Sequence, residues 1–197
     1  KKLINECKEN SKSLIPQGGN TSLVQSATAP KYPSPLYILS SNQSGLNIDE
    51  QRQVVHAAAN ATILEVQDEA AKYGLEFPLD FGAKGTATIG GAIASNAGGM
   101  GVRTSSLIES VTGITGIGKE ETVSGKSISL TDSVLPDPKG FWCGSQGFFG
   151  FITNASLKLN EAPNDKSALM IGTSNLDLIF SSLDHFQDAL PLRMAEL

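Results

Sequence analysis

The chain has 197 residues, of which 40% are hydrophobic and 18% are charged. This balance is typical of a folded domain with a buried core and argues against a disordered chain. The formal net charge is −5 at pH 7 and no cluster of lysine and arginine occurs, so a nucleic-acid partner is excluded from the expectations.

The first half of the chain predicts a helix, several short strands and a second, well-bounded helix. Helical spacing of Leu3, Ile4 and Cys7 indicates the last turns of a helix at the start. Residues 13–15, 36–40 and 54–59 read as short strands separated by polar turns. Residues 62–73 predict a helix that Thr62 and Glu65 cap reciprocally and Gly74 ends. Its apolar face is expected to consist of Ile63, Val66, Ala70 and Tyr73.

The second half predicts mostly strands, followed by a change in composition. Residues 111–117 and 127–130 are expected to be strands of a second sheet. From Phe149 to Leu159 every second residue is apolar or small, which is typical of a half-buried strand. Beyond residues 162–166 we expect a strand at 168–172 and a helix capped by Ser174. Its inward residues would be Leu176, Ile179, Phe180 and Leu183. We therefore divide the chain into a domain over 1–162 and the incomplete start of a second domain over 163–197.

Three glycine-rich segments carry the functional signal: "PQGGNTS" (16–22), "GAKGTATIGGAIASNAGG" (82–99) and "GSQGFFG" (144–150). None fits the P-loop pattern, and "GIGKEE" has Glu121 where a dinucleotide fingerprint needs its third glycine. Glycine nevertheless allows backbone N–H groups to approach a ligand closely. The alternative is that each segment is only a tight turn.

Two of these segments suggest how an anionic cofactor could be held. The loop 18–22 follows a predicted strand and could cradle a diphosphate with its amides. In the second segment, Thr88 could cap a short helix over 89–96 that Gly98 ends. The amino end of that helix would attract an anion. Gly90 and Gly91 would let the helix lie flush against a flat surface.

The same segments carry a resemblance to a known family. "IPQGGNTSLV", "FPLDFGAKGTATIGGAIASNAGG" and "GSQGFFGFITNASL" resemble, in order, the three FAD-binding segments of FAD-linked D-2-hydroxyacid dehydrogenases. These are vanillyl-alcohol-oxidase-type flavoproteins, and they include D-lactate and D-2-hydroxyglutarate dehydrogenases and the glycolate oxidase flavin subunit. The resemblance implies an α+β fold: a PCMH-type FAD-binding domain of two α+β subdomains, followed by the first strand and helix of a cap domain.

The resemblance also implies the chemistry and the residues that bind the cofactor. The cofactor would be non-covalent FAD, and hydride from the carbon that bears the substrate hydroxyl would pass to flavin N5. The cofactor-binding residues would be, in the first segment, Pro16, Gly18, Gly19, Asn20, Thr21 and Ser22. In the second they would be Pro78, Gly85, Thr88, Ile89, Gly90, Gly91, Ser95, Asn96 and Gly98. In the third they would be Gly144, Ser145, Gly147, Gly150 and Ile152.

The sequence departs from the family pattern in several places. Gln146 stands where the family has glutamate, "GKEETVSG" and "DSVLPDPKG" replace two usual segments, and the basic element after the second segment is reduced to Arg103-Thr104-Ser105. The family's substrate-binding basic residues and metal-binding histidines are expected beyond this chain, so no catalytic residue is assigned. A divalent metal is expected only there, and these 197 residues alone should not oxidise a hydroxyacid.

Individual side chains add little chemistry. Lys84 and Arg103 are expected at the surface or near the cofactor. His56 and His185 are expected to be ordinary core or surface histidines, so a Ser-His-Asp triad has no support. Trp142 and Phe148 flank the third segment and could pack on the cofactor, but core packing is their expected fate. The partners expected for the whole protein are a small 2-hydroxyacid and an electron acceptor. Two alternatives stay open: a same-fold flavin oxidase of another alcohol, and a degenerate, non-catalytic domain used for binding or assembly.

The cellular setting is only loosely constrained. Cys7 and Cys143 lack the spacing of a zinc or disulfide framework, which favours a reducing, intracellular compartment such as the cytoplasm or mitochondrion. No apolar run approaches the roughly 18 residues that a spanning helix needs. The chain begins without methionine and ends within a helical pattern, so we interpret it as a piece of a longer protein.

Overall fold

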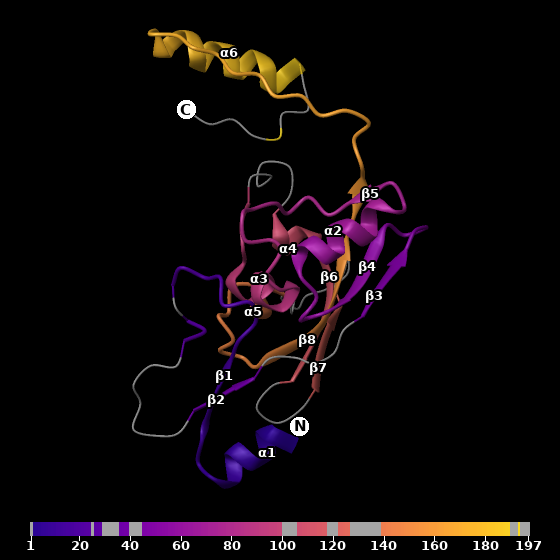
Figure 1. Ribbon diagram of the computed structural model, residues 1–197, viewed down its shortest axis with the longest axis vertical. Helices are drawn as coiled ribbons and strands as arrows, with labels where there is room; N and C mark the ends of the chain where they lie inside the picture. The colour runs from indigo at the N-terminus through magenta and orange to yellow at the C-terminus, as the bar shows by residue number, and fades with distance from the viewer. Residues whose placement is uncertain are drawn as a thin grey trace, which may run out of the picture.

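The computed structural model describes residues 2–24, 26–28, 36–39, 45–99, 106–117, 122–126, 139–189 and 193, and Figure 1 shows how their elements are arranged. The helices are α1 (Lys2–Glu9), α2 (Ile63–Ala71), α3 (Ile89–Ser95), α4 (Leu107–Ser110), α5 (Lys139–Trp142) and α6 (Leu176–Ala189). The strands are β1 (Ser13–Pro16), β2 (Leu36–Leu39), β3 (Leu46–Asp49), β4 (Val54–Ala58), β5 (Leu75–Glu76), β6 (Val111–Ile117), β7 (Thr122–Lys126), β8 (Phe151–Lys158) and β9 (Asn160–Glu161).

The centre of the domain is a five-stranded antiparallel sheet in the order β3-β4-β8-β6-β7. β8 is long enough to pair with β4 along one edge and β6 along the other, for example at Ala57↔Ala155 and Ile114↔Ala155. The prediction that 111–117 belongs to a second sheet is therefore wrong. The predicted strand at 127–130 lies outside the described residues.

Two small sheets accompany the large one. β1 and β2 pair in parallel from Ser13↔Leu36 to Pro16↔Leu39, and β5 pairs antiparallel with β9. α1, β1 and β2 lie together at the lower end of the molecule in Figure 1, away from the large sheet's covering helices. Both the α+β class and the arrangement in two α+β parts are as predicted.

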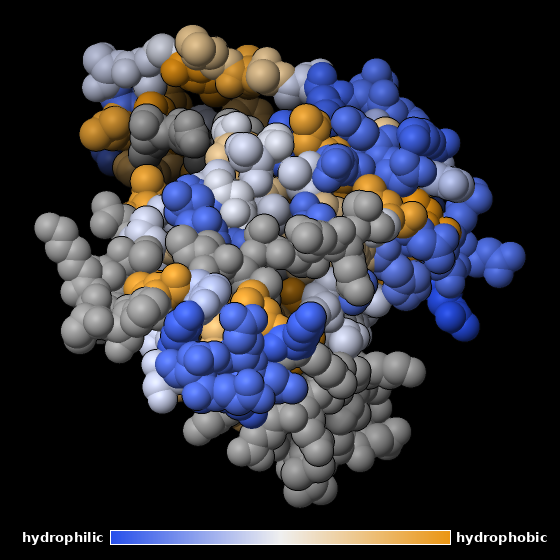
Figure 2. Space-filling model, turned by 60° about the horizontal axis from the view of Figure 1, so that its bottom comes forward, coloured by the Kyte–Doolittle hydropathy of each residue, from blue (hydrophilic) through white to orange (hydrophobic). Residues whose placement is uncertain are grey.

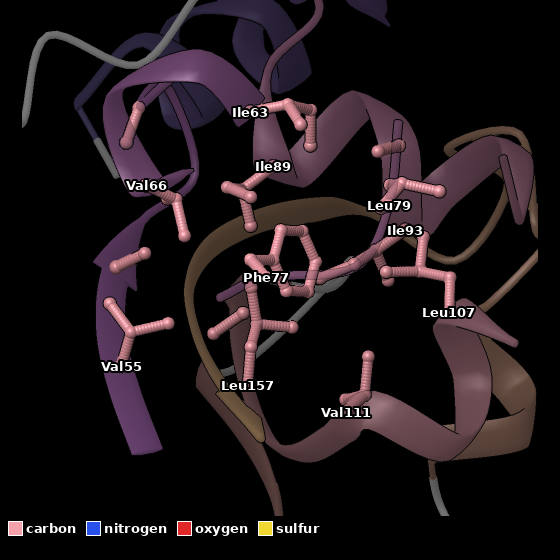
Figure 3. Close-up of a cluster of buried hydrophobic side chains, with 14 of the residues drawn as sticks. Val55, Ile63, Val66, Phe77, Leu79, Ile89, Ile93, Leu107, Val111 and Leu157 are labelled. Carbon is pink, nitrogen blue, oxygen red and sulfur yellow. The ribbon is translucent and has the colours of Figure 1, made fainter. Parts of the chain in front are cut away.

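The core lies between one face of the large sheet and the helices α2 and α3. Figure 3 shows Val55 of β4 and Leu157 of β8 directed toward side chains of both helices. Phe77, which is 2% exposed, fills the space between them. The buried helix residues at the centre are Ile63, Val66, Ala70, Ile89, Ala92 and Ile93. The sheet's other face is polar, because β4 and β8 turn alternate residues toward solvent.

α2 shows how local sequence fixes one of these helices. The Glu65 N–H donates to Thr62 Oγ1 at 3.1 Å, and the Thr62 N–H donates to Glu65 Oε2 at 2.7 Å. Gly74 adopts φ +66° just past the helix. The predicted capping box and the left-handed stop are confirmed. The prediction that Tyr73 belongs to the apolar face of this helix is wrong, since Tyr73 follows the end of the helix and is 43% exposed.

The half-buried strand is confirmed as β8, where Ala155 and Leu157 are buried and Asn154 and Lys158 are exposed. Phe149 is the exception to that alternation. It precedes the first paired residue, Phe151, and is 50% exposed. Large hydrophobic side chains are exposed in several other places as well. Figure 2 shows hydrophobic patches separated by strongly hydrophilic areas.

The end of the chain differs from the prediction. Residues 168–172 form no strand and Leu169 to Ile171 are exposed, since no described strand lies alongside to take their backbone hydrogen bonds. α6 does form, but Asn175 Oδ1, not Ser174, accepts from the Asp177 N–H at 3.0 Å. Leu176 and Phe180 are exposed, against the prediction that they point inward.

Ion pairs on β5 tie this C-terminal segment to the rest of the fold. The Glu76 carboxylate is largely buried and accepts hydrogen bonds from the guanidinium of Arg193 through both oxygens. Lys166 Nζ lies 3.3 Å from Glu76 Oε2. The backbone also contributes, because the Ala162 N–H donates to the Gly74 carbonyl. α6 stands apart from the large sheet in Figure 1, so these contacts near β5 anchor the segment that carries it.

Candidate functional site

The first and second glycine-rich segments pack directly on each other. Gly18 and Gly19 follow β1, and their open sides face the turn that leads into α3. A methyl group added to Gly18 would overlap Thr88 Oγ1, and one added to Gly19 would overlap the carbonyl oxygen of Thr86. Only glycine allows the two backbones to approach this closely. At both positions the missing side chain makes room for protein, not for a ligand.

The third segment packs on the carboxyl end of α3. The Gly144 N–H donates to the Ile93 carbonyl at 2.9 Å, and the Gln146 N–H donates to the Ala94 carbonyl at 2.7 Å. The second bond satisfies a carbonyl that the end of the helix leaves unpaired, whereas the Ile93 carbonyl also accepts from the Asn96 N–H. Gly147 lies against Pro16 of β1 so closely that a side chain there would overlap the proline ring. Three segments separated by up to 130 residues therefore meet around one short helix.

The amino end of α3 is occupied by protein hydrogen bonds. The amides of Ile89 and Gly90 donate to the carbonyls of Ala61 and Ala59, each at 2.8 Å. The Gly91 N–H donates to Thr88 Oγ1 at 3.2 Å, which confirms Thr88 as the cap. The expectation that this end binds an anion is wrong, because its N–H groups already have acceptors.

The other end of α3 also differs from expectation. Asn96, with φ +48° and ψ +53°, is the left-handed residue that ends the helix. Gly98 lies two residues further on, so it is not the stop that the sequence indicated. Asparagine tolerates this conformation because its short polar side chain can bond locally. The helix thus ends at Ser95, one residue before the end that the sequence indicated.

The loop 18–22 is the part of the site that keeps its donors. Within the described part of the chain, none of the five amides of residues 18–22 donates to another group. Gly18, Asn20 and Thr21 are exposed, and Asn20 takes a left-handed φ of +52°. Consecutive outward amides with a left-handed residue among them form a concave anion-binding site. This loop fits a diphosphate.

A second polar group near α3 is also without a partner. Ser145 Oγ in the third segment is buried and makes no hydrogen bond to any described residue. A buried hydroxyl normally has a partner, so this one is a further donor or acceptor for a ligand. Gly144 beside it is exposed with φ +78°. The residues present therefore fit a cofactor with a diphosphate and additional polar groups.

The remaining predicted site residues fall into two groups. Gly85 and Gly91 are exposed. Among the described residues, a methyl added to Gly85 would meet only Leu64 Cδ2, at 3.8 Å, and one added to Gly91 only Thr88 Oγ1, at 3.1 Å. Others are engaged by the protein: Ile89 is fully buried, Gly90 lies on Ala59, and Ser95 Oγ donates to the Gly91 carbonyl at 2.9 Å. Ile152 packs at the margin of the core, and Gly150, with φ +137°, directly precedes β8. Ser22 accepts from the Val24 amide, and Pro78 lies between two buried residues.

Side chains considered singly stay outside this arrangement. Lys84 Nζ pairs with Asp80 Oδ1 at 2.8 Å, and His56 Nδ1 lies 2.8 Å from Ser156 Oγ on the polar face of the sheet. Trp142 is 4% exposed, as expected of a core residue, whereas Phe148 is 88% exposed and that expectation is wrong. Arg103 lies outside the described residues.

The described residues contain no group of three or more His, Cys, Asp or Glu side chains that could hold a metal ion. A depression of about 500 Å³ lies beside α2, lined in part by Asn60, Glu65, Asp68 and Glu69. Its carboxylates would repel a diphosphate, so we do not assign the cofactor to it.

Comparison with known protein families identifies the domain. The family described as "FAD binding domain" matches residues 1–124. The chain belongs to this FAD-binding family. Its cofactor is FAD, and the unbonded amides at 18–22 are compatible with the diphosphate of that cofactor. None of the described helices is long and apolar enough to cross a membrane.

Several curated proteins are similar to this FAD-binding domain over most of its length. A D-2-hydroxyglutarate dehydrogenase from Stutzerimonas stutzeri (strain A1501) is 30% identical over 190 residues, which cover 93% of this chain and 40% of that protein. A putative mitochondrial D-lactate dehydrogenase from Schizosaccharomyces pombe is 26% identical over 95% of this chain and 36% of its own length. The mitochondrial D-2-hydroxyglutarate dehydrogenase of Bos taurus is 30% identical over 86% of this chain and 31% of its own length.

Solved structures support the fold. An alkyldihydroxyacetonephosphate synthase superposes with a TM-score of 0.70 over 83% of this chain and 30% of that chain, at 17% sequence identity. At this identity the likeness concerns the fold alone. The chain spans about two fifths or less of the curated relatives described above.

Proposed function

We propose that this chain is the FAD-binding portion of a flavin-dependent dehydrogenase that oxidises a D-2-hydroxyacid to the 2-oxoacid. The relatives named for D-2-hydroxyglutarate and D-lactate support this substrate class. The single structural observation that carries the proposal is the convergence of three glycine-rich segments around α3, with five unbonded amides at 18–22 beside it.

We assign the diphosphate of FAD to the amides of residues 18–22. Gly85, Thr88 and Gly91 would border the cofactor, and Gly144 and Ser145 would close around it from the third segment. Ile89, Gly90 and Gly147 support the site from behind through their contacts with the protein. Bound FAD would supply a hydride acceptor for the substrate C–H, and the role of these residues is to hold and orient it.

The proposal also includes the domain boundary, the reaction partners and the cellular compartment. Residues 1–162 would form the FAD-binding domain, and residues 163–197, with α6, would begin a substrate domain. The substrate would be a small 2-hydroxyacid, and the electrons would leave to a separate acceptor. Cys7 and Cys143, the only two cysteines of the sequence, lack the spacing of a disulfide framework, which supports a reducing, intracellular compartment.

Flavin binding is the first test. The chain, purified and stripped of flavin, would be titrated with FAD, FMN and riboflavin while flavin fluorescence is followed. We expect saturable binding of FAD and much weaker binding of FMN and riboflavin, since only FAD carries a diphosphate. A protein that binds none of the three would be a degenerate member of the family, and the proposed function would be wrong.

The substrate class needs a second measurement. The protein for this test is a flavin-loaded chain in which this domain is joined to a region that matches the remainder of the relatives. It would be mixed anaerobically with glycolate and with the D- and L-enantiomers of 2-hydroxyglutarate and lactate. We expect the D-enantiomers to bleach the flavin and the L-enantiomers to leave it oxidised. The 197 residues alone should bind FAD and remain oxidised with all of them, while dithionite, as a control, reduces the flavin.

A further inference from the structure

The first glycine-rich segment continues into a loop that is closed at its base. The side chain of Gln17, directly after β1, donates from Nε2 to the Ala27 carbonyl at 2.7 Å. The chain therefore leaves the β1 end at Gln17 and returns to it at Ala27. The amides of residues 18–22 lie on the first half of this loop. Leu23 and Val24, further along, are 98% and 68% exposed.

The returning half of the loop reaches the third segment through one hydrogen bond. Ser26 Oγ donates to Gln146 Oε1 at 2.8 Å, which joins residues 120 positions apart. Both side chains are exposed, so the bond lies at the rim of the site rather than in the core. Ser26 therefore links the returning half of the loop to a distant segment of the chain.

The backbone of Gln146 is held in place independently of this bond. Its amide donates to the Ala94 carbonyl at the end of α3, and it has a left-handed φ of +53°. A residue other than glycine or asparagine is uncommon in this conformation, so the position is determined by the surrounding contacts. The third segment, tied to the end of α3, thus presents Gln146 as an acceptor for Ser26 on the returning half of the loop.

We propose that Ser26 and Gln146 form a clasp that holds residues 26–28 on the third segment, beside the proposed diphosphate site, and slows release of the cofactor. This inference rests on the proposed binding of FAD at residues 18–22. With the clasp closed, the first and third segments are joined at the rim as well as at the Pro16–Gly147 contact. Opening the clasp leaves the glycine contacts intact and lets the outer part of the loop move away.

The first test measures how fast FAD leaves. Ser26→Ala removes the donor, and Gln146→Met removes the acceptor with little change of side-chain length. A hydrogen bond between neutral groups corresponds to about a threefold to tenfold change in rate. We expect each variant to release FAD faster by that factor. The release rate is measured from the recovery of flavin fluorescence after dilution. The double variant should be no faster than either single one, because both remove the same bond.

Two further variants separate the clasp from general disturbance. Gln146→Glu keeps an oxygen acceptor for Ser26 and should restore slow release. Gln53→Met is the matched control, since Gln53 is also a left-handed glutamine, at φ +52°, in the turn before β4. It should release FAD at the parental rate. Parental release from both Ser26→Ala and Gln146→Met, or additive effects in the double variant, would overturn the clasp.

A second readout needs no cofactor. Chymotrypsin should cut the flavin-free protein after the exposed Leu23, and cleavage should be threefold to tenfold faster in Ser26→Ala and Gln146→Met. If the parent protein binds no FAD, the proposed function fails while this comparison still decides the clasp. Equal cleavage rates in the parent and both variants would show that the bond does not hold the loop.

Discussion

Gly90 and Gly91 are adjacent in α3, and the structure predicts opposite results when each is changed to alanine. A methyl group at Gly90 would lie 2.7 Å from Ala59 Cβ and 3.1 Å from the Ala59 carbonyl oxygen. The Gly90 N–H also donates to that carbonyl, so the helix cannot withdraw without losing the bond. At Gly91 only Thr88 Oγ1, at 3.1 Å, is near, and the other side is open.

The sizes of the two effects follow from these contacts. Replacing glycine by alanine inside a helix gains about 1 kcal/mol. Overpacking at Gly90 costs about 1–3 kcal/mol, and the rigid neighbour places this case near the upper end, so Gly90→Ala should lose about 2 kcal/mol. Gly91→Ala should lie between no change and a gain of about 1 kcal/mol, because a small shift of the Thr88 cap offsets part of the gain.

Thermal unfolding of the flavin-free protein, followed by circular dichroism, measures both effects. For a chain of this size 1 kcal/mol corresponds to about 2–4 °C in Tm, so Gly90→Ala should melt about 4–8 °C lower and Gly91→Ala at or above the parental Tm. FAD affinity should fall at least severalfold in Gly91→Ala, because the new methyl group faces the proposed site. If Gly90→Ala melts with the parent, the close packing of α3 on Ala59 is wrong.

Three further predictions concern other parts of the fold. Burial alone would raise the pKa of Glu76, but the hydrogen bonds and charges of Arg193 and Lys166 outweigh it and lower that pKa. Glu76→Gln should therefore lose about 1 kcal/mol at pH 7. A carboxylate with a lowered folded pKa stabilises the fold above its unfolded pKa of about 4, and this stabilisation is lost as pH falls through the folded value. Urea unfolding at pH 7 and pH 3 should therefore show a smaller difference between Glu76→Gln and the parent at pH 3. Gly19→Val should loosen the first segment as well as abolish FAD binding, because the new side chain meets the Thr86 carbonyl. Gly82→Ala, with open space around it, should change neither Tm nor FAD affinity. A Gly19→Val protein with parental Tm and FAD affinity would contradict the packing. Acid precipitation should release FAD into the supernatant, and flavin retained in the pellet would show a covalent link.

Local signals in the sequence determined much of the secondary structure. The capping box of Thr62 and Glu65, the stop at Gly74 and the alternation along β8 each involve groups only a few residues apart. The reciprocal hydrogen bonds of the cap and the burial of alternate β8 residues therefore agree with what the sequence predicts. The strands β1, β2 and β4 were predicted close to their observed bounds, while β3 was missed because "LNID" is short and alternates weakly.

The family and its cofactor also came from sequence, through three glycine-rich segments that occur in the expected order. What the sequence alone could not supply was the direction in which each glycine faces. Gly19 and Gly90 have the same signature as Gly91, yet a side chain on the first two would strike Thr86 and Ala59. Whether a glycine makes room for a ligand or for another segment depends on residues far away in the chain.

Tertiary contacts decided the remaining features for the same reason. The amino end of α3 has the sequence of an anion site, but Ala59 and Ala61, about 30 residues earlier, accept its first two N–H bonds. β6 joins the central sheet because β8 offers it an unpaired edge, and residues 168–172 form no strand because no described edge is beside them. Backbone hydrogen bonding between distant segments is satisfied only once the chain has folded, so periodicity and composition determine which elements form, and the assembled fold determines which donors are left for the cofactor.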